Sequence, residues 1–171
     1  RLALSDLGLT QIEPLRSRIR VVLPPSADID KVRERLARVC GIANFFMAQS
    51  APLNLTHPDL DGLNAAIIEE LRSQSFSTFR VTAKRDDKRL VLTSMDVERT
   101  VGAAVCEGTG KKVSLRDPDL TVYIELLSKE AYYSVKKIQG PGGMPVGVSG
   151  LVACLISGGI DSPVAAYRMI K

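Results

Sequence analysis

The sequence has 171 residues, a net charge of +4, 45% hydrophobic residues and 25% charged residues. This composition is typical of a globular chain and excludes a disordered one, and the length suits one domain or two small ones. No apolar run approaches the roughly 18 residues that a membrane-spanning helix needs, and no signal peptide is visible, so we expect a cytoplasmic protein that makes no membrane contact. Three widely spaced cysteines and a single histidine argue against a metal site, a disulfide framework or a histidine-based triad.

Residues 1–58 predict an N-terminal domain of ferredoxin-like type. The pattern is two strands rich in Ile and Val, a helix that begins after Asp28 and has Gly41 as its C′ residue, and a returning strand that carries two aromatics. The front of this domain looks truncated, because there is no Met at position 1 and residues 1–7 read like the end of a helix. The expected strands are residues 11–15, 17–23 and 42–51.

Residues 59–139 predict an α/β layer in the order helix, strand, helix and three strands. The second helix begins with the capping box Thr93-Ser94-Met95-Asp96, and Gly108 is its expected stop. The expected helices are residues 59–73 and the segment from 93 to 108; the expected strands are residues 78–83, 113–115, 120–127 and 131–137.

Basic side chains are concentrated in this second segment, and residues 80–89 hold five of them with two acidic ones. Taken alone, such a stretch is more often a solvated edge of a sheet than a binding surface. Few aromatic residues lie near it for base stacking, so any RNA contact would depend on phosphate charge and RNA shape. The candidate RNA-binding residues are Arg80, Lys84, Arg85, Lys88, Arg89, Lys111, Lys112, Lys136 and Lys137.

Residues 140–150 are rich in glycine and proline and predict no packed element. They could form a glycine loop near a ligand or a connector between domains, and we favour the connector.

Residues 151–171 predict a buried strand over 151–156, a tight glycine turn and a helix. The turn, Ser157-Gly158-Gly159-Ile160-Asp161-Ser162, directs unpaired N–H groups and the positive end of a helix dipole toward an anion, as a phosphate site requires. No Walker loop is present, and the alternative is an ordinary turn capped by Asp161 and Ser162. A doubly wound nucleotide-binding domain needs further strands, so we expect the chain to be part of a larger enzyme.

Four stretches together resemble the tRNA 4-thiouridine synthetase family. They are residues 80–85 (RVTAKR), 92–102 (LTSMDVERTVG), 137–147 (KIQGPGGMPVG) and 155–165 (LISGGIDSPVA). The resemblance implies a ferredoxin-like domain (1–58), a THUMP RNA-binding domain (59–139), a linker (140–150) and the start of a PP-loop ATP pyrophosphatase domain (151–171). It also implies ATP-dependent thiolation of a tRNA uridine, with sulfur from a persulfide carried by a cysteine desulfurase, and sulfur supply for the thiamine thiazole.

The family's PP-loop residues transfer directly onto this sequence. The resemblance implies that ATP is bound by Leu155, Ile156, Ser157, Gly158, Gly159, Asp161 and Ser162, with Asp161 as the catalytic carboxylate that holds Mg²⁺ or orients the phosphates. The sulfur-carrying cysteine would lie beyond Lys171, so we expect residues 1–171 alone to be inactive. Two other functions stay open, a non-catalytic tRNA-binding module and a PP-loop synthetase that acts on a small molecule; a homodimer is also left open.

Overall fold

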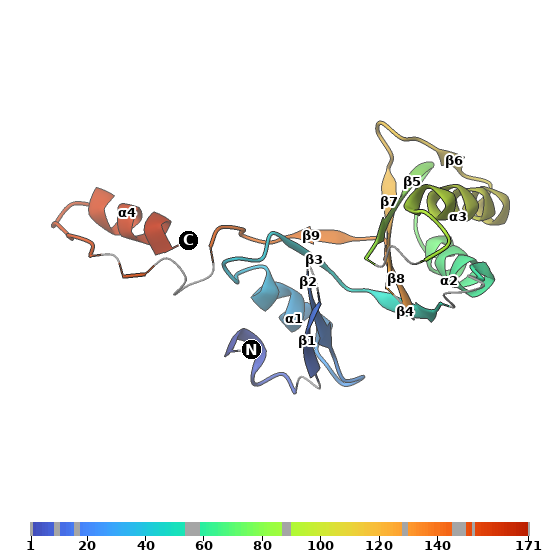
Figure 1. Ribbon diagram of the computed structural model, residues 1–171. Coiled ribbons are helices and arrows are strands. Elements are labelled where there is room, and N and C mark those ends of the chain that lie inside the picture. The colour runs from blue at the N-terminus through green and yellow to red at the C-terminus, as the bar shows by residue number, and fades with distance from the viewer. Residues whose placement is uncertain are drawn as a thin grey trace. The chain divides into compact units, whose positions relative to one another are not determined.

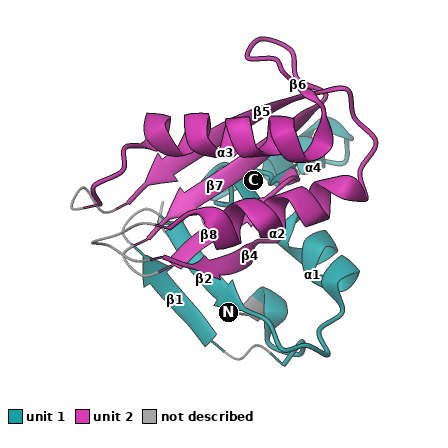
Figure 2. Cartoon of the chain, turned by 90° about the vertical axis from the view of Figure 1, so that its right-hand side faces the viewer, with its two compact units in different colours: residues 1–45, 138–171 teal, residues 46–137 magenta. Residues whose placement is uncertain are grey.

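The structure is a computed structural model that describes residues 2–8, 11–15, 18–53, 59–86, 90–127, 130–144, 150–151 and 153–170. The chain forms two compact units, which Figure 2 distinguishes by colour. Residues 46–137 (magenta) are called the central unit here, and residues 1–45 together with 138–171 (teal) are called the terminal unit.

The central unit contains the helix and strand order that the sequence predicts for its second segment. An additional strand, β4, precedes this order and comes from residues before position 59. The elements, labelled in Figure 1, are β4 (Gln49–Pro52), α2 (Asp61–Arg72), β5 (Thr78–Arg85), α3 (Ser94–Thr109), β6 (Lys112–Val113), β7 (Leu120–Leu126) and β8 (Glu130–Ser134).

The strands of the central unit form one mixed sheet. Within the described residues its order is β4-β8-β7-β5-β6. Strand β5 is parallel to β6 and β7, whereas β8 is antiparallel to β7 and β4. Figure 2 shows α2 and α3 side by side over one face of this sheet. The fold class is therefore α+β, as the sequence predicts.

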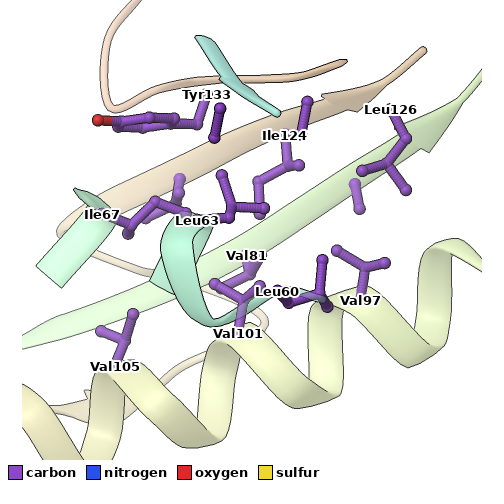
Figure 3. Close-up of a cluster of buried hydrophobic side chains, with 14 of the residues drawn as sticks. Leu60, Leu63, Ile67, Val81, Val97, Val101, Val105, Ile124, Leu126 and Tyr133 are labelled. Atoms are coloured by element: carbon purple, nitrogen blue, oxygen red, sulfur yellow. The ribbon is translucent and has the colours of Figure 1, made fainter. Parts of the chain in front are cut away.

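The hydrophobic core lies between this sheet face and the two helices (Figure 3). Side chains of β5 and β7 alternate between the faces, so every second residue of each strand points into the core. The helices contribute residues spaced three and four apart, as one apolar face requires. The least exposed core side chains are Phe79, Ile67, Leu71, Ile124, Leu126, Val97, Val101, Val105 and Val122.

Helix α3 begins as its sequence predicts. The Thr93 hydroxyl accepts the backbone N–H of Asp96 at 3.2 Å, and the Asp96 carboxylate accepts the Thr93 N–H at 2.9 Å, which is the reciprocal pair of a capping box. These bonds from Thr93 hold the pKa of Asp96 below its usual range.

The expected stop of α3 at Gly108 is wrong, because the helix continues to Thr109 and Gly110 is its C-cap in the left-handed region, with φ +69°. Gly108 is required for a different reason. A Cβ at this position would come within 2.8 Å of Ile68 Cδ1, so glycine permits the close approach of α2 and α3.

The terminal unit begins with the expected pair of strands and the expected helix. Strands β1 and β2 pair antiparallel, and Asp28 accepts the Lys31 N–H at 3.0 Å as the N-cap of α1. The helix ends at Leu36 rather than just before Gly41. The elements with residues in this unit are η1 (Leu2–Leu4), β1 (Gln11–Leu15), β2 (Arg18–Val22), α1 (Ile29–Leu36), β3 (Asn44–Phe46), β9 (Lys137–Gln139) and α4 (Asp161–Ile170).

Two of the expected strands are divided in the structure. The segment 42–51 forms the separate strands β3 and β4, and the segment 131–137 forms β8 and the first residue of β9. Strand β3 pairs with β9, whereas β4 pairs with β8 in the central sheet. The strands thus change partner at the residues where the chain passes from one unit to the other.

The first glycines after β9 are bound to the chain rather than free. Gly140 N–H donates to Ala43 O at 3.0 Å, and Gly142 exchanges backbone bonds with Gly41 and Ile42 at 2.7 and 2.9 Å. A Cβ on Gly140 would lie 2.1 Å from Ile42 O, so only glycine fits there. The start of the glycine-rich segment is therefore packed, while residues 145–149 lie outside the described residues.

The expected strand over residues 151–156 differs from what the structure describes. Residues 151 and 153–156 are exposed and belong to no strand, and Val152 lies outside the described residues. A strand requires hydrogen-bonded neighbours, and the strands of the described residues pair elsewhere.

A glutamate on α2 makes stability depend on pH. The Glu70 Oε2 atom is buried without a hydrogen-bond partner among the described residues, and burial raises the pKa of this carboxyl. The folded state therefore favours the proton, so Glu70 destabilises the fold as the pH rises above the ordinary glutamate pKa of about 4.3. We expect Glu70→Gln to stabilise the protein at pH 7 but not at pH 4, as measured by urea unfolding; equal effects at both pH values would contradict this.

Candidate functional site

The loop from Ser157 to Ser162 is closed by its two serines. The Ser162 hydroxyl accepts the Ser157 N–H at 2.8 Å and donates to Ser157 O at 3.3 Å, and the two hydroxyl oxygens lie 3.1 Å apart. Gly159 N–H lies 3.4 Å from Ser157 Oγ. These bonds bend the chain back on itself immediately before α4, which begins at Asp161.

The two glycines of this loop are not explained by packing within the chain. Neither has a positive φ, and a Cβ on Gly158 would meet no atom within 4 Å. The nearest atom to a Cβ on Gly159 would be Ser157 Oγ, at an ordinary 3.7 Å. Glycine at these positions instead leaves the backbone open to a group outside the described chain, next to the N-terminus of a ten-residue helix.

All seven residues expected to bind ATP lie in or beside this loop. Leu155 and Ile156 precede it with 94% and 69% of their surface exposed, and the Asp161 side chain is also exposed at the first position of α4. A phosphate would meet open backbone, two hydroxyls and one carboxylate at this position. The carboxylate and phosphate oxygens are ligands that suit Mg²⁺.

The expected RNA-binding cations fall into two groups. Lys84, Lys112, Lys136 and Lys137 are exposed, whereas Arg80 and Arg85 are half-buried. Arg80 donates to Leu115 O at 3.3 Å, and Arg85 Nη1 donates to two carbonyl oxygens of the segment that leads into α3. Lys88 and Arg89 lie outside the described residues.

Aromatic rings accompany two of the lysines. Lys111 Nζ lies 5.6 Å from the centroid of the Phe76 ring, and Lys137 Nζ lies 5.5 Å from that of Tyr123. Tyr123 and Lys137 line a shallow depression of the central unit together with Gln74, Asp119, Thr121 and Lys136. The sequence analysis did not single out Tyr123, although the alternation of β7 places it opposite the buried Val122 and Ile124.

Asp119 was also missed, and its role is structural. Its carboxylate accepts the N–H groups of Ser77 and Thr78 at 2.9 and 2.8 Å, which joins the starts of β5 and β7. These bonds hold the pKa of Asp119 below its usual range. A single aspartate before a strand gives no signal of a partner 41 residues away in the sequence.

Two searches of the described residues complete the description of the surface. They contain no group of three or more His, Cys, Asp or Glu side chains that could hold a metal ion. Their helices are all too short or too polar to cross a membrane.

Two family models match the chain, one in each unit. The THUMP domain matches residues 53–136, and the family described as thiamine biosynthesis protein (ThiI) matches residues 147–171. The first match lies within the central unit, and the second contains the serine-closed loop.

Curated and solved proteins show the same similarity. A probable tRNA sulfurtransferase of Thermus thermophilus is 43% identical over 82% of this chain and 34% of its own length. The crystal structure of PH1313 from Pyrococcus horikoshii has a TM-score of 0.83 and 25% identity, covering 99% of this chain and 54% of that one. A 4-thiouridine synthetase–RNA complex with bound ATP has a TM-score of 0.70 and 23% identity, covering 99% and 43%, and supports the fold.

The chain is shorter than these proteins. It spans 34 to 43% of the length of the curated relatives that match it best.

Proposed function

We propose, on the premise that this chain belongs to the ThiI-type tRNA sulfurtransferase family, that it is part of an enzyme that converts a tRNA uridine to 4-thiouridine at the expense of ATP. One observation carries the proposal. The serine-closed loop, whose glycines are not needed for packing, occurs in one chain with a unit that matches a THUMP domain. The first offers a site for phosphates and the second a surface for RNA.

The chemistry that we propose has two steps. The uracil oxygen at C4 attacks the α-phosphorus of ATP, and pyrophosphate leaves. A persulfide sulfur, delivered from a cysteine desulfurase, then attacks C4, and AMP leaves with the oxygen. The N–H groups at the start of α4 and the serine hydroxyls would bind the phosphates and orient the α-phosphorus. Asp161 would hold Mg²⁺, which offsets phosphate charge when bound.

The proposal is tested by a requirement for both substrates. The full-length protein, incubated with unmodified tRNA, ATP and a persulfide donor, should release AMP only when tRNA is present, and digested tRNA should contain 4-thiouridine by mass spectrometry. AMP release without tRNA, and with a small amine or acid instead, would favour a small-molecule synthetase. A role in supplying sulfur for the thiamine thiazole is tested by growth of a deletion strain without thiamine.

Residues 1–171 by themselves test the non-catalytic alternative. We propose that this chain binds tRNA in a salt-dependent manner and forms no adenylate, because its exposed lysines lie in the central unit whereas its nucleotide site is one loop and one helix. Adenylate formation by residues 1–171 would contradict this.

A further inference from the structure

Two adjacent cations on β5 point to opposite faces of the central sheet. Phe79, Val81 and Ala83 point into the core, and Arg85 continues this series, whereas Lys84 lies on the other face and is exposed. Side chains on opposite faces cannot both contact an RNA backbone that lies against one of them. The sequence run Lys84-Arg85 therefore does not act as one basic patch.

The guanidinium of Arg85 is bound by the protein itself. Its Nη1 atom donates to Leu90 O at 2.9 Å and to Leu92 O at 3.2 Å, and both bonds are partly buried. The Leu90 side chain is only 3% exposed. Hydrogen bonds from a charged donor are stronger than neutral ones, and releasing this group to an RNA phosphate would leave two carbonyls without it.

These bonds fix the segment that leads from β5 into α3. Leu92 is followed directly by Thr93, the N-cap of α3, and the charge of Arg85 acts on the Asp96 carboxylate of the same capping box. On the other side, Asp86 N–H donates to Leu126 O at 3.0 Å. Arg85 thus holds the entry of α3 while its own strand is held by β7.

We propose that Arg85 is a positioning residue for RNA binding: it fixes both ends of the β5–α3 connection, whose sequence includes Lys88 and Arg89, and makes no phosphate contact itself. The inference rests on the proposed function of the central unit in binding tRNA. Fixing the ends of a connection lowers the conformational entropy that is lost when its side chains bind. Loss of the clamp should weaken RNA binding about two- to tenfold, which corresponds to about one immobilised side chain.

The salt dependence of binding separates a positioning residue from a phosphate contact. A lost phosphate contact flattens the slope of log affinity against log salt by roughly 0.7 to 0.9, whereas a lost positioning contact lowers affinity at every salt concentration and leaves the slope unchanged. We would titrate tRNA into the full-length protein and into the variants Arg85→Gln, Arg85→Lys and Lys84→Gln at several salt concentrations. Hydrogen exchange of the amides of residues 90–97 would report on the clamp, and exchange in β7 on the fold.

We expect Arg85→Gln to weaken binding with an unchanged slope, to accelerate exchange at residues 90–97 and to leave β7 protected. Arg85→Lys retains the charge and a donor but not the planar geometry, so it should recover part of the affinity and protection. Lys84→Gln, on the exposed face, should flatten the slope without changing exchange.

Three results would overturn the inference. A flattened slope in Arg85→Gln would make Arg85 a direct phosphate contact, and faster exchange with unchanged affinity would make it a purely structural residue. If Arg85→Gln also loses protection in β7, Arg85→Lys decides, and full affinity in that variant despite faster exchange at residues 90–97 would overturn the inference. Absence of tRNA binding by the unaltered protein would instead contradict the proposed function.

Discussion

Replacing Asp161 by alanine in the full-length protein should lower tRNA-dependent AMP formation by about 10²–10³-fold, the loss that is typical when one group that stabilises transition-state charge is removed. The carboxylate is exposed at the first position of α4, directly after the glycines that leave the backbone open. No bond among the described residues is assigned to this carboxylate, so its removal should cost little stability.

The conservative variant Asp161→Asn makes this test sharper. It keeps the size and can still cap the helix, but it removes the negative charge that Mg²⁺ requires. Both variants should therefore lose AMP formation while keeping the tRNA affinity of the unaltered protein, because position 161 lies outside the central unit. Ser162→Ala is a useful comparison, since it removes the bonds that close the loop and retains the carboxylate. Normal AMP formation by Asp161→Asn would contradict the role that we give to the charge.

The sequence predicts features that depend on neighbouring residues. The capping box of Thr93 and Asp96 satisfies its own backbone groups within one turn, so it forms as its pattern predicts. The hydrophobic alternation of β5 and β7 also predicts their core faces correctly. The same alternation places Arg85 on the core side of β5, so its position could have been predicted from the sequence. Counting charges along the run 80–89 obscured this signal.

Features that depend on distant residues could not be predicted in the same way. The stop of α3 was assigned to Gly108 instead of Gly110 because a glycine that permits helix contact and a glycine that ends a helix look alike in sequence, and the contact is with Ile68, forty residues earlier. The pairing of Ser50 with Tyr132 brings β4 into the central sheet across a similar separation. Both cases follow from packing, which local propensity does not contain.

The largest stability effect should come from Phe79→Ala in the central strand β5. The Phe79 side chain is fully buried and meets Phe76 edge to face, with ring centroids 6.2 Å apart and an interplanar angle of 83°. Removing a buried phenylalanine ring costs about 3–5 kcal/mol, because the apolar surface loses its burial and the cavity collapses only in part. This is a large fraction of the roughly 5–15 kcal/mol that stabilises a typical domain.

Native-state hydrogen exchange of the β5 and β7 amides measures this loss in the central unit itself. Protection should fall by the full free energy, because these strands exchange only when the core opens. Phe79→Leu, which keeps most of the apolar volume, should cost roughly half as much or less. Val91→Ala is the surface control: its side chain is 71% exposed, and it should change stability by no more than about 0.5 kcal/mol. Equal losses in Phe79→Ala and Val91→Ala would show that the core does not lie where the burial of Phe79 places it.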